Sequence, residues 1–186
     1  MDVRHMAVQV APKANSAAFV EDPTDIGGSS DESRTELISF AIGDEQYGVD
    51  IMAVREIKEW SNVTRLPDQP DYIRGVLNLR GVIVPIIDLR CRFGQGVTES
   101  TPMHIIIIVQ IEDRQVGLLA DRVLDIVSFE TGKVQRVPKV DPGAGAEFLA
   151  GLITIEGTMI ALIDLPNLLA AGAEADKHVE QQAVPA

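Results

Sequence analysis

Short apolar runs separated by turn residues dominate the middle of the chain. Residues 36–49 contain two such runs around a Gly-Asp-Glu turn, and residues 76–87 contain two more around an Arg-Gly pair. Both arrangements are typical of strands joined by hairpin turns. Pro85 lies inside the last run and has no N–H to donate, so we expect the sheet to open locally there. Helical patterns are restricted to short segments at 51–57 and 165–170, and the chain is therefore predicted to be mainly β.

The chain also repeats itself, with a register offset that grows from 69 to 76 residues. The first pair of blocks shares five of its eighteen residues, among them Gly48 and Gly117. Each half spans about 55 to 65 residues, a size that buries its surface inefficiently alone and gains by packing against its twin. The repeat therefore predicts two related barrels with a common interface. The aligned blocks are 40–57 with 109–126, 63–67 with 134–138, and 75–89 with 151–165.

The ends of the chain differ from this repeated region. Residues 1–34 mix Ala, Ser, Gly, Pro and Asp without a helical or strand period, and are expected to be a flexible leader. Residues 170–186 are rich in alanine and small polar residues and are expected to fray. The domain should therefore cover residues 35–169. We place the first barrel mainly in 35–92 and the second mainly in 103–165, with room for the two to exchange terminal elements.

The composition of the chain limits the classes of function that it can have. Hydrophobic residues make up 46% of the 186 residues, enough for a packed core. Acidic residues outnumber basic ones by 28 to 16, and the formal charge of −12 argues against nucleic acid as a partner. The single cysteine, Cys91, cannot close an internal disulfide, which fits a reducing compartment. There is no apolar segment of signal-peptide type, and the longest aliphatic run, 105–109, is too short to span a membrane. We therefore expect a cytoplasmic protein without membrane insertion.

One enzyme hypothesis deserves testing. The repeat places Asp88 and Asp164 in equivalent IIDL and LIDL settings, and two close carboxylates that share a proton would make a hydrolytic dyad. Leucine follows both aspartates, however, whereas an aspartic protease has Thr or Ser and then Gly. The favoured interpretation is that each aspartate caps a helical turn after a strand.

A charge difference distinguishes the two halves. Arg80 occupies a hairpin tip whose counterpart in the second half is Glu156. A lone arginine at such a tip is usually a solvated turn residue. Opposite charges on a duplicated scaffold can instead make one surface specific for one partner.

Other residues offer no catalytic set, metal site or cofactor site. His104 is the only histidine away from the ends and has no second ligand nearby, so it is expected to mark a strand entry. Gly94 and Gly96 lack the third glycine of a phosphate-binding loop. A duplicated β scaffold without such groups most plausibly binds other proteins.

Three blocks then become recognisable: YGVDIMAVREI (47–57), VTRLP (63–67) and YIRGVLNLRGVIVPIIDLR (72–90). The chain resembles the CheW family of bacterial chemotaxis adaptors from about Leu37 to Leu169. The resemblance implies an all-β fold with short helices, made of two pseudo-symmetric five-stranded barrels of Src-homology-3 type. It also implies a scaffold without catalysis or cofactor. Such a scaffold would couple the cytoplasmic tip of a chemoreceptor (a methyl-accepting chemotaxis protein) to the regulatory domain of the CheA kinase.

By motif position, the resemblance implies a receptor-binding surface drawn from both halves, whereas it assigns no kinase-binding residue. Two alternatives stay open at this point: an adaptor of a non-chemotactic sensory array, and a hydrolase that uses the paired aspartates. The implied receptor-binding residues are Val54, Glu56, Gly75, Arg80, Val123, Ile126 and Gly151.

Overall fold

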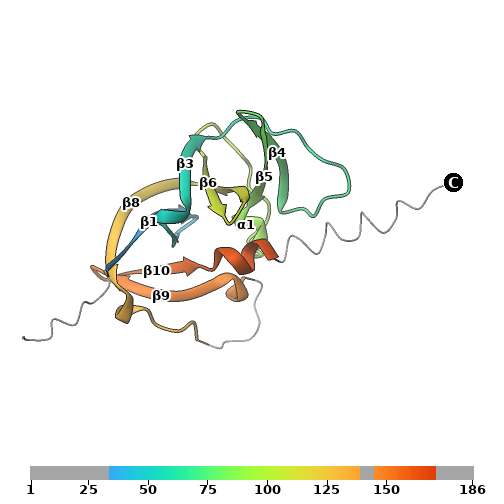
Figure 1. The fold of residues 1–186 in the computed structure, drawn as a ribbon. Coiled ribbons are helices and arrows are strands. Elements are labelled where there is room, and N and C mark those ends of the chain that lie inside the picture. The colour runs from blue at the N-terminus through green and yellow to red at the C-terminus, as the bar shows by residue number, and fades with distance from the viewer. Residues whose placement is uncertain (1–33, 139–144, 171–186) are drawn as a thin grey trace, which may run out of the picture. The chain divides into compact units, whose positions relative to one another are not determined.

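The computed structural model describes residues 34–138 and 145–170, whose strands form two five-stranded sheets (Figure 1). The expected leader and tail thus lie outside the described residues, apart from Arg34 and Ala170. The first sheet has the order β8-β1-β2-β10-β9, with β1 (Arg34–Ile42), β2 (Glu45–Asp50), β8 (Arg122–Glu130), β9 (Leu149–Ile155) and β10 (Thr158–Ile163). The second has the order β3-β6-β7-β5-β4, with β3 (Val54–Glu59), β4 (Ile73–Leu79), β5 (Val82–Asp88), β6 (Ile105–Ile111) and β7 (Arg114–Ala120).

The two sheets are related by the sequence repeat, because each strand of β1 to β5 has its counterpart five strands later in the other sheet. Each half nevertheless contributes its first hairpin to the sheet of the other half. The expected division, mainly 35–92 and 103–165, left room for an exchange of terminal elements, and the strand order shows that the elements exchanged are the first hairpins. The chain passes from one sheet to the other through residues 51–53 and again at Asp121, and this exchange lets residues of both halves be buried in one hydrophobic cluster.

The barrels are open in the described residues, since neither sheet pairs its two edge strands with each other. Instead, the segment that follows β3 crosses to β4, where Thr64 and Val76 exchange two backbone hydrogen bonds of 2.9 and 2.8 Å. The segment that follows β8 crosses to β9 in the same way through Gln135 and Leu152. These matched crossings leave each barrel with only an isolated bridge near its open edge, and their equivalence confirms the predicted duplicated architecture.

Pro85 opens the second sheet as predicted. The parallel ladder between β5 and β7 begins only at Ile86. In the other sheet, the repeat counterpart of Pro85 is Ala161, and it pairs with Tyr47 within a ladder that starts one residue before it. The missing N–H of proline accounts for this difference.

Three clusters of buried side chains hold the fold together. Two lie within single sheets, one around Ile86 and Ile106 and the other around Leu37 and Ile153. The largest joins the sheets, with Phe40 and Val49 from the first and Ile107 and Leu118 from the second. We call this largest cluster the shared core. Burial of this many aliphatic side chains between the sheets, at about 1.5–3 kcal/mol each, makes the two halves depend on one another.

The helical predictions were only partly correct. The expected helix at 51–57 is a 3-10 turn, η1 (Ile51–Ala53), after which the chain is extended as β3. The prediction at 165–170 is confirmed, and a four-residue helix, α1 (Leu89–Arg92), follows β5. Within the described part of the chain, no helix is long and apolar enough to cross a membrane. The remaining 3-10 turns are η2 (Thr131–Lys133) and η3 (Ala146–Phe148).

Candidate functional site

Val54 and Val123, which the repeat aligns, both pack against the shared core. Val54 opens β3 opposite Val109, and Val123 lies on β8 opposite Phe40. The two strands are edge strands of different sheets. Both of these expected receptor-binding residues therefore border the shared core, each from an edge strand of its own sheet.

Two exposed isoleucines, Ile57 and Ile126, lie on the same two edge strands. Ile126 is 56% exposed and lies opposite Ile38, a residue of the shared core. Ile57, its repeat counterpart, is 42% exposed and lies opposite Ile107 of the same core. Directly paired residues on antiparallel strands share a face, so both isoleucines lie on the faces that form the core but remain in contact with solvent. The resemblance did not include Ile57, although the repeat aligned it with Ile126. We call Val54, Ile57, Val123 and Ile126 the junction surface.

Glu56 and Arg80 form an ion pair with 3.5 Å between Oε2 and Nη2. Glu56 lies on β3, whereas Arg80 lies at the tip of the β4–β5 hairpin, so the pair joins the two edges of the second sheet. The Arg80 side chain is 89% exposed, and its planar guanidinium is therefore still available to another carboxylate.

Gly75 and Gly151 are buried beneath the crossing segments. A Cβ on Gly75 would overlap the carbonyl of Thr64, and Gly75 has a φ of +139°. A Cβ on Gly151 would overlap the side chain of Val134. Their burial gives these expected receptor-binding residues a packing function: they let the crossing segments approach β4 and β9.

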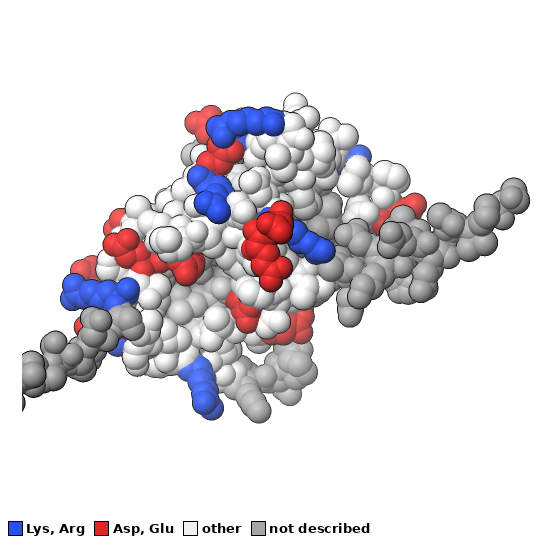
Figure 2. Space-filling model, viewed as in Figure 1, with Lys and Arg blue, Asp and Glu red and all other residues white. Residues whose placement is uncertain are grey.

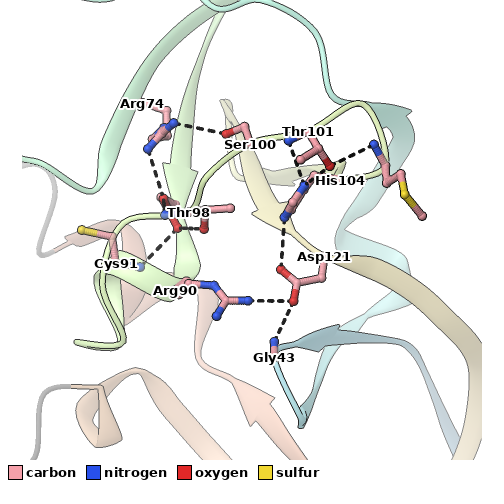
Figure 3. A network of polar contacts seen from close by, with 11 residues as sticks. Gly43, Arg74, Arg90, Cys91, Thr98, Ser100, Thr101, His104 and Asp121 are labelled. Carbon is pink, nitrogen blue, oxygen red and sulfur yellow. Dashed lines mark hydrogen bonds and ion pairs between the residues drawn. The ribbon is translucent and has the colours of Figure 1, made fainter.

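Asp88 and Asp164 do not form a pair in which two carboxylates share a proton. Asp88 is fully buried and accepts hydrogen bonds from the Cys91 N–H and from both the N–H and the hydroxyl of Thr98. Arg74 lies 3.6 Å away as an ion pair (Figure 3). Asp164 instead accepts from the backbone and side chain of Asn167. Each carboxylate therefore accepts hydrogen bonds within the segment that follows its own strand. This arrangement supports the capping interpretation and argues against the hydrolase hypothesis.

Within residues 34–138 and 145–170 we find no further catalytic arrangement. Burial raises the pKa of the Cys91 thiol, which keeps it protonated and poorly nucleophilic. Among the described residues, no three His, Cys, Asp or Glu side chains are placed to hold a metal ion. On the face drawn in Figure 2, acidic and basic side chains are scattered around broad uncharged areas. This arrangement suits a protein-binding surface better than a site for a charged small molecule.

Comparisons with known proteins agree with this description. Residues 36–173 match the family described as "CheW-like domain". The chain is 42% identical over 133 residues to "Chemotaxis protein CheW" of Rhizobium meliloti (strain 1021), a match that covers 72% of this chain and 86% of that protein. It is 38% identical over 136 residues to the protein of the same name from Klebsiella aerogenes, covering 73% and 82%.

A solved structure extends the similarity to the fold. The scaffolding protein TtCheW from Thermoanaerobacter tengcongensis superposes with a TM-score of 0.65 at 33% sequence identity. The superposition covers 70% of this chain and 84% of that protein.

Proposed function

The chain belongs to the CheW family of non-catalytic chemotaxis scaffolds, and we propose that it couples the cytoplasmic tip of a chemoreceptor to the regulatory domain of the CheA kinase. The receptor tip would bind at the junction surface, and receptor state would pass to the kinase through the scaffold. The protein would work in the cytoplasm at receptor arrays.

One observation carries the proposal: apolar residues at repeat-matched positions of β3 and β8 border the same shared core and remain partly exposed. A helix that docks on such a surface contributes apolar side chains every three or four residues. The neighbouring Arg80 would add a charge-assisted contact to an acidic group on that helix. Gly75 and Gly151 would act indirectly, by shaping the strands beneath the surface.

The proposal is tested by co-sedimentation of the protein with receptor signalling fragments and with CheA. We expect the unmodified protein to bind both and to show no turnover of its own. Ile126→Asp should weaken receptor binding by about tenfold or more, because it places a charge in the apolar contact. Binding to CheA should be retained.

A matched control is available in Met159, which is 59% exposed on β10 and lies outside the junction surface. Met159→Asp makes the same kind of change and should leave receptor binding within about twofold. Equal loss of receptor binding in both variants, or no receptor binding by the unmodified protein, would contradict the proposal.

A further inference from the structure

Asp121 lies at the single-residue connection between β7 and β8, where the chain passes from the second sheet to the first. Its backbone N–H donates to the carbonyl of Ala41 at 3.0 Å. Its side chain accepts a hydrogen bond from the N–H of Gly43 at 2.7 Å and pairs with Arg90 at 2.8 Å. The other carboxylate oxygen lies 3.5 Å from Nε2 of His104 (Figure 3).

These contacts join elements of both sheets. Gly43 belongs to the β1–β2 turn of the first sheet, Arg90 to α1 after β5, and His104 precedes β6 of the second sheet. The Nδ1 atom of His104 accepts a hydrogen bond from the N–H of Thr101 at 3.0 Å, which orients the ring with Nε2 toward Asp121. The Asp121 and Arg90 side chains are only 20% and 28% exposed, so solvent screens their pairing less than at an open surface. We call Gly43, Arg90, His104 and Asp121 the clasp.

The matched junction in the other half has no such arrangement. The repeat places Met52 at the position of Asp121, Glu112 at that of Gly43, and Pro166 at that of Arg90. Met52 is 81% exposed, and neither it nor Pro166 can form an ion pair. Since that junction adopts the same strand order, the architecture does not require a clasp. Its presence at only one junction points to a role beyond folding.

We propose that Asp121 is a positioning residue, which holds the beginning of β8, and with it Val123 and Ile126, in the place that the receptor requires. This inference rests on the proposed receptor-binding function. Asp121 is two residues before Val123, and the clasp ties it to the sheet that carries Val54 and Ile57. Loss of the clasp would let the two sides of the junction surface shift relative to each other without removing any contact residue.

The test measures the affinity of Asp121→Ala, Arg90→Gln and the double variant for a receptor signalling fragment and for the CheA regulatory domain. Each single variant should weaken receptor binding by about fivefold to tenfold and leave kinase binding within about twofold. Because both residues act through one clasp, their effects should not add. The receptor affinity of the double variant should lie within about twofold of that of the single variant with the larger loss. Asp113→Ala, which removes the same charge from an exposed turn residue, should bind like the unmodified protein.

Four results would overturn the inference: unchanged receptor affinity in a folded Asp121→Ala, equal losses for receptor and kinase, fully additive losses in the double variant, or loss of receptor affinity in Asp113→Ala. If Asp121→Ala does not fold, Asp121→Asn takes its place in the same binding measurements, because asparagine keeps an acceptor for the N–H of Gly43. Failure of the unmodified protein to bind the receptor fragment would instead refute the proposed function on which the inference rests.

Discussion

Two charged residues adopt left-handed backbone conformations at matched hairpin tips: Arg80 with a φ of 52° and Glu156 with a φ of 50°. Each is followed by a glycine with positive φ, as in a type I′ turn. Asn, Asp or Gly would fit this conformation with less strain. The sequence predicted the turns and their opposite charges, but only the structure shows that Arg80 pairs with Glu56 on another strand.

We expect Arg80→Glu to weaken receptor binding on the order of 2 to 4 kcal/mol, because a charge-assisted contact is lost and a like charge is introduced. The fold should survive, since an exposed turn residue usually shifts stability by only about 0.5 kcal/mol. Binding titrations with receptor fragments, together with circular dichroism melts, measure both effects.

The double variant Glu56→Arg, Arg80→Glu separates two explanations. It restores an ion pair between the same positions with the charges exchanged. Continued weak binding would show that the receptor needs a positive charge at position 80, whereas full recovery would show that the pair only orders the surface. Receptor affinity within twofold of the unmodified protein in Arg80→Glu itself would identify Arg80 as a solvated turn residue.

The buried glycine of β4 allows a sharp stability test. Gly75→Ala should lower the free energy of unfolding by about 2 to 4 kcal/mol, because its Cβ would meet the Thr64 carbonyl in a strained backbone conformation. Gly81 has positive φ but open space around it, so Gly81→Ala should cost only about 1 kcal/mol. Chemical denaturation measures both, and equal losses would rule out the packing explanation.

At the level of secondary-structure elements, equivalent sequence positions have acquired unequal structural roles. Asp88 and Asp164 both follow a strand and begin a helical turn. Only Asp88 also holds the connection between the halves, through Thr98, and pairs with Arg74. The cap was predictable from the local sequence, whereas the contact with Thr98 depends on how the connecting segment folds back over β5.

Asp88→Asn should therefore destabilise the protein by about 3 kcal/mol, because a buried ion pair and an acceptor of three hydrogen bonds are disrupted. Asp164→Asn should cost less than about 1 kcal/mol, since asparagine is also a good N-cap. Urea denaturation of the two variants compares them directly. Similar losses at both sites would mean that Asp88 is no more than a cap.

At the scale of the whole molecule, the exchanged hairpins make each sheet a product of both halves. β1 and β2 pair with β8 and β10, while β6 and β7 pair with β3 and β5. Neither half alone can complete a sheet, and the shared core also takes residues from both. The repeat thus records a duplication whose products have become inseparable.

Fragments 34–102 and 103–170 should each be largely unfolded when expressed separately, because each fragment lacks a hairpin of the first sheet and a hairpin of the second. Mixed or co-expressed, they should associate into a folded complex in which the strand pairings are restored. Circular dichroism and size-exclusion chromatography of the separate and mixed fragments provide the measurement. Stable, cooperative folding of either fragment alone would contradict the exchange.

The sequence by itself determined the two hairpins at 36–49 and 76–87, their turns, the repeat and the local opening at Pro85. These features depend on side-chain alternation, turn chemistry and a missing N–H, all of which act within a few residues. Membership of the CheW family was likewise predictable from ordered local motifs, and the comparisons confirm it.

Only the tertiary structure decided which hairpin completes which sheet, which residues border the shared core, and which residues form the clasp. Gly43 and Asp121 are 78 positions apart, and the local pattern of neither residue specifies the other as its partner. The entropy of closing a loop grows only slowly with its length, so the sequence distance does not select among distant pairings. That selection comes from burying the apolar faces of both sheets in one shared core, which is a property of the assembled chain.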